Sequence, residues 1–334
     1  MVTEKNKYIK WIDLAKGFGI VMVLVGHINF LPVIIKNYIY SFHMPYFMIL
    51  SGIVFSYKSS FDKFISKKIK TLIIPYIFFT FVLFLFFSLK KIYYGNRGFL
   101  TSFINLFTLK EVYAPWYLIC LFFVTIIYYF VVKLINNNKI IIIITTILML
   151  FFGIYYFTKI KIQLPLQFQY VFTMIVFFSI GYIIKVYNLS NKIFKIRYVI
   201  IFFVLSVFFY YLKMKYSIPY TSITSNIYGN FLIFYPLAIF SSFYIIGICI
   251  KINSIPILDY IGKNSIVYFS MQQATVLFPI MLIVEHFFGS KIYMNFNFFV
   301  SCIITFVLLL VNIIVLTIEN IILSKTKLKV LIGK

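Results

Sequence analysis

Residues 11–27 read WIDLAKGFGIVMVLVGH, an apolar run that contains an aspartate, a lysine and a histidine. The run approaches the ~20 residues that a helix needs to cross a bilayer. We do not expect a cleaved signal peptide here, because the run carries Asp13 and Lys16 and no small-x-small cleavage site follows it. We therefore interpret residues 11–30 as a first membrane-spanning helix that holds polar groups inside it.

The composition of the whole chain agrees with a membrane protein. Of the 334 residues, 63% are hydrophobic and only 11% are charged, which is too few for a water-soluble surface. Apolar runs of about 20 residues recur, and the polar segments between them are too short to form separate domains. The runs also lack the alternating ~10-residue pattern of a membrane β-barrel. The sequence predicts an all-α, polytopic membrane helical bundle with about ten transmembrane helices, and one integral-membrane domain over residues 1–334.

The predicted spans cover residues 11–30, 37–57, 72–89, 115–134, 139–157, 167–187, 196–213, 229–250, 264–287 and 294–323. If the N-terminus lies in the cytoplasm, the segments between spans on the cytoplasmic side carry roughly twice as many lysines and arginines as those on the outer side. We therefore expect a multi-pass protein of the plasma membrane with both termini in the cytoplasm. The net charge of +24 then reflects orientation and attraction to membrane lipids, and we expect no nucleic-acid partner.

Several small residues inside the predicted spans have packing interpretations. Cys120, Cys249 and Cys302 all fall within spans, where we expect apolar packing residues and neither a disulfide nor a metal site. Ser51 and Gly52 lie mid-span, where a glycine allows close helix contact and a serine can bond across helices. We do not interpret Ser51 as a nucleophile.

Lys16 and His27 lie on nearly the same face of the predicted first helix. Eleven positions separate them, which corresponds to about three turns and roughly 16 Å of rise. Asp13 lies one turn before Lys16 and can pair with it. A charged group within a span costs about 2.5–3.5 kcal/mol on insertion scales, so such groups normally face the bundle interior or a watery cavity. Asp13 and Lys16 also have an alternative explanation without a function: their side chains would extend to the inner membrane–water interface and keep their charges in water.

A second histidine is expected at the depth of the first. The stretch SFHMPYFMILSG, residues 41–52, begins just below the predicted outer surface after a short turn, which brings His43 close to the level of His27. Two histidines at one depth favour chemistry over simple packing. His286, beside Glu285 near the outer end of the ninth span, is instead interpreted as an interfacial residue.

Five segments carry a resemblance to a known family: IDLAKGFGIVMVLVGH (12–27), SFHMPYFMILSG (41–52), FISKKIKTLIIPY (64–76), APWYL (114–118) and IGKNSIVYF (261–269). In order and span count, the chain resembles the integral-membrane acyltransferases of acyltransferase family 3, especially the fucose 4-O-acetylase-like branch. The family's first helix carries an arginine, ten residues and a histidine, a spacing that Lys16 and His27 preserve here. The resemblance implies that His27 is essential for moving an acyl group from acyl-coenzyme A to a hydroxyl, usually of a surface glycan or its lipid-linked precursor.

The chain departs from the family pattern at two places. Lysine replaces arginine at position 16, and Lys67, Lys68 and Lys70 stand where the family often has arginines. Lysine keeps the charge but loses the planar fork that grips phosphate with two hydrogen bonds. Many relatives also end the last motif with a histidine, where this chain has Gln272, which can hydrogen-bond but cannot carry a proton.

The residues suggest separate donor-binding and catalytic roles that fit this resemblance. The phosphates of a cytosolic acyl-CoA require cations on the inner face, and Lys67, Lys68 and Lys70 are candidates, although topology alone also explains them. His27 would act as a general base or as a transient acyl carrier. His43 would orient His27, stabilise the oxyanion or hold the acceptor.

Two features are candidates for the acceptor side. Trp116 and Tyr117 offer a stacking surface for a sugar ring, with an interfacial aromatic belt as the alternative. The loop over residues 90–114, with Arg97 and Glu111, is a candidate acceptor-facing flap.

The sequence therefore predicts a membrane O-acyltransferase, in particular an O-acetyltransferase. Its donor substrate would be acetyl-CoA or another acyl-CoA, and its acceptor a glycan or lipid-linked sugar. A transporter or flippase for lipid-linked sugars is the main alternative, although we find no paired Gly/Pro-interrupted spans and no two-half symmetry. A sensory or scaffold protein is a third reading, and it predicts no dependence on His27.

Overall fold

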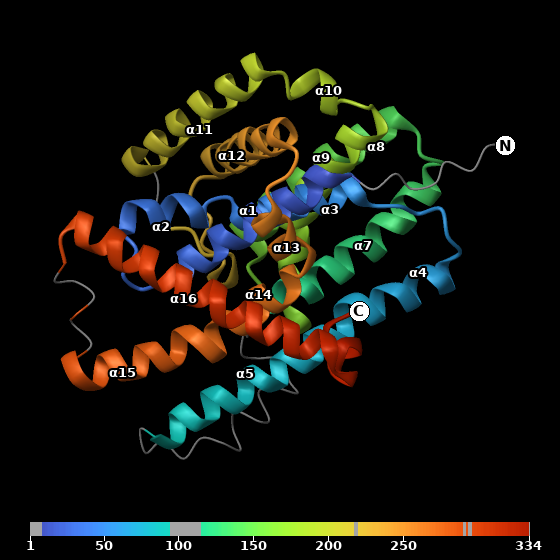
Figure 1. Ribbon diagram of the computed structural model, residues 1–334. Helices are drawn as coiled ribbons and strands as arrows, with labels where there is room; N and C mark the ends of the chain where they lie inside the picture. Colours follow the sequence, from blue (N-terminus) through green and yellow to red (C-terminus); the bar gives the residue numbers. More distant parts are fainter. Residues whose placement is uncertain (1–8, 94–114, 217–219, 290–291, 293–295, 334) are drawn as a thin grey trace.

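All regular elements in the described part of the chain are helices, as Figure 1 shows for the computed structural model. The structure describes residues 9–93, 115–216, 220–289, 292 and 296–333. Within these ranges there is no strand, and one isolated bridge joins Ser222 to Ile227. The predicted all-α bundle is confirmed.

The α-helices are α1 (Lys10–His27), α2 (Val33–Tyr40), α3 (His43–Val54), α4 (Phe61–Lys68), α5 (Ile74–Tyr93), α7 (Trp116–Leu134), α8 (Lys139–Tyr155), α9 (Gln169–Val186), α10 (Ser190–Ile193), α11 (Ile196–Tyr216), α12 (Phe231–Ile252), α13 (Pro256–Lys263), α14 (Ser265–Met271), α15 (Phe278–Phe288) and α16 (Phe298–Lys325). Short turns of π-helix lie at η1 (Ile69–Ile73), η2 (Tyr156–Ile160) and η5 (Gln272–Leu277), and 3₁₀ turns at η3 (Pro165–Gln167), η4 (Ile223–Ser225) and η7 (Lys327–Ile332).

Eight helical segments among the described residues are long and apolar enough to cross a membrane. They are Phe61–Phe86, Trp116–Leu134, Lys139–Ile160, Pro165–Val186, Ile196–Tyr216, Phe231–Ile252, Ser265–Phe287 and Phe298–Lys325, and they match the third to the tenth predicted spans. Asparagine side chains fix the beginnings of three of them: Asn138, Asn230 and Asn297 accept hydrogen bonds from the first free backbone N–H groups of α8, α12 and α16. The chain is a multi-pass membrane protein.

The first two predicted spans differ from expectation. Helix α1 has 18 residues and ends at His27 instead of continuing to residue 30. The prediction of one continuous helix over residues 37–57 is wrong, because the chain breaks between α2 and α3. The Ser41 hydroxyl donates to the carbonyl of Asn37 (2.7 Å) and closes α2, while Phe42, at φ −145°, turns the backbone before α3 begins at His43. The break places His43 on the first turn of a new helix.

Two backbone-to-backbone crossings, both made by glycines, position the helices that carry the histidines. Helices α3 and α9 meet where Gly52 lies against Phe178 and Gly181 against Ile49; a Cβ at either glycine would lie 2.0 Å from the facing carbonyl oxygen. Gly262 of α13 fits in the same way against the Asp13 carbonyl of α1, where a Cβ would lie 1.9 Å away. This confirms the close helix contact predicted at Gly52.

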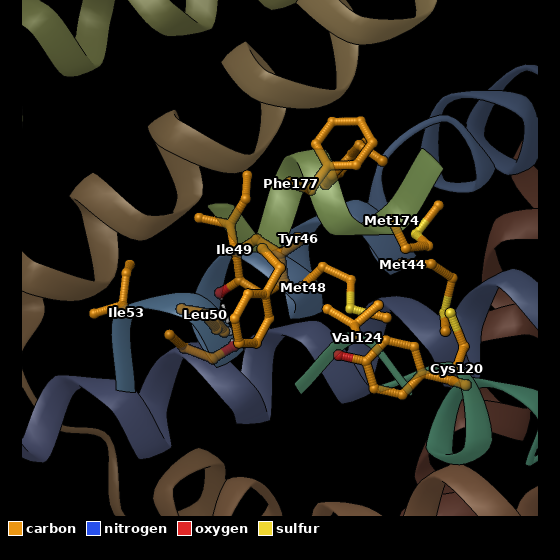
Figure 2. Packing of buried hydrophobic residues seen from close by; sticks show 14 of the residues in the cluster. Met44, Tyr46, Met48, Ile49, Leu50, Ile53, Cys120, Val124, Met174 and Phe177 are labelled. Atoms are coloured by element: carbon orange, nitrogen blue, oxygen red, sulfur yellow. Dashed lines mark hydrogen bonds between the residues drawn. The ribbon is translucent and has the colours of Figure 1, made fainter. Parts of the chain in front are cut away.

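The interior and the periphery of the bundle differ in composition. Helices α1, α3 and α9 lie centrally in Figure 1, whereas α8, α11 and α16 expose most of their apolar side chains, as a lipid-facing helix does. Figure 2 shows the central packing, where Met44 and Met48 of α3 lie in one cluster with Cys120 of α7 and Met174 of α9. The predicted flap begins inside α5, which ends at Tyr93, and its remaining residues, with Arg97 and Glu111, lie outside the described ranges.

Candidate active site

The two predicted histidines lie at one cavity, and the backbone fixes the same tautomer in both. Nδ1 of His27 lies 2.8 Å from the Val23 carbonyl oxygen, and Nδ1 of His43 lies 2.9 Å from the Ile39 carbonyl oxygen. A carbonyl only accepts, so each Nδ1 carries the proton and donates it. Nε2 of each neutral ring then has a lone pair available for chemistry.

The cavity, hereafter the histidine cavity, has a volume of about 250 Å³. Its walls are His27, Tyr40, His43, Met44, Trp116, Phe269, Gln272, Gln273 and the segment 220–224. The Tyr40 ring neighbours both histidines, with its centroid 6.0 Å from that of His27 and 5.1 Å from that of His43. The two imidazoles therefore share both a cavity and an aromatic neighbour.

Hydroxyl and amide groups contribute much of the remaining wall of the histidine cavity. Thr221, Ser222 and Thr224 come from the turn between α11 and α12, and Gln272 and Gln273 come from η5. Gln272 is 1% exposed, and among the described residues its Oε1 has no hydrogen-bond partner. A buried acceptor without a partner is costly, so it is suited to receive a hydrogen bond from a bound hydroxyl.

A buried lysine that sequence reasoning missed anchors this polar turn. Lys213 of α11 is 3% exposed, and its Nζ donates to the hydroxyls of Ser41 and Thr221, both at 2.6 Å. The Tyr170 hydroxyl holds the same turn by donating to the carbonyl of Thr224 (2.7 Å). Lys213 falls at the end of a predicted span, where the sequence alone suggests only a loop lysine that contributes to membrane orientation. The Ser/Thr-rich run over residues 217–226 was the available clue.

A second, larger cavity of about 730 Å³, hereafter the lysine cavity, lies toward the other end of α1. Five lysines contribute to its wall, namely Lys16, Lys58, Lys63, Lys67 and Lys68, and none of the described lining residues is acidic. Apolar and aromatic side chains, among them Phe47 and Phe64, complete it. Such a cavity suits a ligand that combines several negative charges with an apolar part.

The structure places the predicted donor-side residues unequally. Lys67 and Lys68 line the lysine cavity, whereas Lys70, in the π turn that precedes Pro75, is not part of its wall. Lys16 lines it too, and its Nζ lies 3.9 Å from Oδ1 of Asp13. Asp13 precedes His27 by fourteen positions, or about 21 Å of helix. Lys16 therefore belongs to the lysine cavity, and Asp13, which pairs with it but is not part of the cavity wall, lies far from the histidines.

The two predicted acceptor-side aromatics are divided between the cavities. Trp116 lines the histidine cavity, while Tyr117 lines the lysine cavity, where its hydroxyl lies 3.4 Å from the Ser51 hydroxyl. His286 is exposed on α15 and lines neither cavity. A third, smaller and mostly apolar cavity of about 210 Å³ is also lined by His27, and it shares His27 and Gln273 with the histidine cavity.

This arrangement defines a polytopic membrane protein with a histidine site inside the bundle and a cationic cavity at the opposite end of the same helix. The family model described as an acyltransferase domain, Acyl_transf_3, matches residues 9–317. The chain therefore belongs to the acyltransferase 3 family and is a membrane acyltransferase. No curated protein and no solved structure matches the chain.

Proposed function

We propose that the protein is an O-acetyltransferase that moves an acetyl group from cytosolic acetyl-CoA to a hydroxyl of a cell-surface or lipid-linked glycan. The observation that carries the proposal is the pair of histidines with unprotonated Nε2 atoms at one polar cavity, adjoining a cavity walled by lysines. The family match supports acyl transfer over transport of a lipid-linked sugar. Donor, acceptor and the role of His27 are the parts that we propose.

The lysine cavity is suited to the phosphates of the donor. Lys67 and Lys68 at the end of α4, with Lys58 and Lys63, would bind the phosphate groups, and Lys16 would extend the positive field along α1. Lys16 and His27 are eleven positions apart on one helix, so a bound donor has to bridge roughly 16 Å to present its thioester to the imidazole. An extended pantetheine arm can do this.

His27 would act on the acceptor hydroxyl. Its Nε2 takes the hydroxyl proton as the oxygen attacks the thioester carbonyl, the C–S bond breaks, and the imidazolium returns the proton to the departing sulfur. In the covalent variant, Nε2 first attacks the carbonyl and the C–S bond breaks, leaving an acyl-imidazolium and a thiolate; the hydroxyl oxygen then attacks the acyl carbon, neutral imidazole leaves, and the hydroxyl proton passes to the thiolate. Both routes end in an ester, a free thiol and a neutral His27.

The remaining cavity groups would hold the acceptor. The unpartnered Oε1 of Gln272 would accept a hydrogen bond from a sugar hydroxyl, and Thr221 and Ser222 supply further donors and acceptors. Trp116 lines the same cavity, and its indole ring would stack on a sugar ring. His43 would position this hydroxyl or stabilise the oxyanion.

The overall reaction is tested by comparing the surface glycans of cells with and without the protein by mass spectrometry. We expect a gain of one acetyl group per modified sugar unit when the protein is present, and its loss on mild alkaline treatment, because an O-ester hydrolyses there. Identical glycan masses in the two strains, with the protein expressed in one of them, would refute glycan acetylation.

We propose that the protein lies in the plasma membrane with both termini cytoplasmic, which puts the lysine cavity on the donor side. In vesicles of known orientation, impermeant acetyl-CoA should support acetylation only when it is added to the face that exposes the C-terminus. Equal activity with donor on either face would contradict this orientation and leave acyl transfer intact.

Replacing Lys67 and Lys68 together by glutamine should raise the KM for acetyl-CoA by about tenfold or more, because each lysine loses a charge-assisted bond to phosphate. The effect should shrink at high salt, and the KM for the acceptor should change little. Lys192→Gln on α10, an exposed lysine outside the three cavities described above, is the matched control. Lys70→Gln should have a smaller effect than either Lys67→Gln or Lys68→Gln. An unchanged KM for acetyl-CoA in the double variant would show that these lysines serve only to orient the protein in the membrane.

A further inference from the structure

The lysine cavity and the histidine cavity meet at two side chains. Met44 and Phe269 are the residues common to both walls, and they are 3% and 8% exposed. Met44 follows His43 in the first turn of α3, and Phe269 lies in α14 just before the π turn η5. Both side chains are apolar, whereas the walls on either side of them are rich in polar groups.

Each cavity also reaches the surface of the bundle. The lysine cavity is bordered by exposed side chains such as Lys58, Ser59 and Lys63, and the histidine cavity by Tyr220, which is 42% exposed. Each cavity is therefore open toward the surface, and the two spaces adjoin at their shared wall residues, Met44 and Phe269. A short apolar constriction between hydrated spaces blocks water and ions because wetting it is unfavourable.

The geometry points to Met44 and Phe269 as an apolar gate that seals the two cavities from each other and through which the thioester-bearing arm of the donor passes. The second half of this inference rests on the proposed function, since it requires an acyl-CoA in the lysine cavity. Met44 has the side chain suited to such a gate, because an unbranched thioether changes rotamer easily and packs against many shapes. Phe269 gives the gate a rigid side, with its ring centroid 6.1 Å from that of Tyr117.

The sealing role can be measured without any acyl transfer. Full-length protein is reconstituted in vesicles that contain a pH-sensitive dye, and proton leak is followed under a potassium diffusion potential. Wild-type vesicles should stay tight. Met44→Ala with Phe269→Ala should raise the leak at least ~10-fold, because the constriction becomes wide enough to wet. The matched control is Met48→Ala, which empties a buried methionine site one turn further along α3 (Figure 2) but touches neither cavity.

A second variant guards against loss of folding. Met44→Gln keeps nearly the same length and volume but makes the gate polar, so it should leak while remaining monodisperse in detergent. Coenzyme A added on the side of the lysine cavity should then reduce the leak of Met44→Gln by at least half, because its arm occupies the passage. Tight vesicles for both the double variant and Met44→Gln would overturn the gate. A leak that coenzyme A leaves unchanged would overturn the passage of the donor arm, whether or not the protein acetylates glycans.

Discussion

Replacing His27 by alanine should lower acyl transfer by about 10³-fold or more, because the reaction loses the one group proposed to take the hydroxyl proton or carry the acyl group. Protein yield and thermal stability should change little, since an uncharged histidine at a helix end contributes little to insertion. Glycan acetylation is measured with equal amounts of variant and wild type in the membrane.

Two further histidine variants make this result specific. His27→Gln keeps a hydrogen-bonding side chain but removes the base, so it should be as inactive as the alanine variant. His286→Ala, on the exposed face of α15, should behave as wild type. Near-normal acetylation by a well-expressed His27→Ala variant would contradict the mechanism and favour a role for the bundle that needs no imidazole.

Gly52→Ala and Gly181→Ala should each strongly destabilise the protein. At both positions the new methyl group would lie 2.0 Å from a backbone carbonyl oxygen of the opposite helix, so α3 and α9 must move apart. Overpacking by a single side chain typically costs about 1–3 kcal/mol, and a clash with backbone, which cannot change rotamer, should reach or exceed the upper end. The thermal midpoint in detergent, followed by size exclusion, should fall by several degrees.

Gly26→Ala on α1 provides the comparison for these two variants. Its methyl group would lie 3.2 Å from the nearest atom, which belongs to the Tyr40 side chain and can shift. The same chemical change should therefore cost much less stability there. Equal thermal midpoints for Gly26→Ala, Gly52→Ala and Gly181→Ala would show that the close crossing of α3 and α9 does not limit the stability of the bundle.

The long apolar helices and one side of the site could be predicted from the sequence. Hydropathy alone locates spans such as 139–157 and 196–213, because a bilayer demands a continuous apolar stretch whatever its neighbours are. The spacing from Lys16 to His27 gave their separation, because the rise of a helix is constant. The proximity of His27 and His43 followed from the short connection between the helices that carry them.

Other features depend on tertiary contacts that no local pattern records. The break before His43 was missed because residues 37–57 form one predominantly apolar run, and the break is visible only in the backbone, which leaves the helical conformation at Phe42 (φ −145°). Lys213 was missed because its hydroxyl partners come from distant segments. Trp116 and Tyr117, adjacent in sequence, serve different cavities because successive residues of a helix point about 100° apart.

Helix α16 links the bundle to the thickness of its bilayer. Its 28 residues extend for about 42 Å, whereas the hydrocarbon core of a typical bilayer measures about 30 Å. A helix this long and this apolar tilts or thickens the lipid around it. Because α16 packs against α14 and η5, which carry Phe269 and Gln272, a change in its tilt should shift one wall of both cavities. The thickness of the bilayer should therefore influence the shape of the site, and hydrophobic mismatch should displace the gate residue Phe269 and Gln272 together.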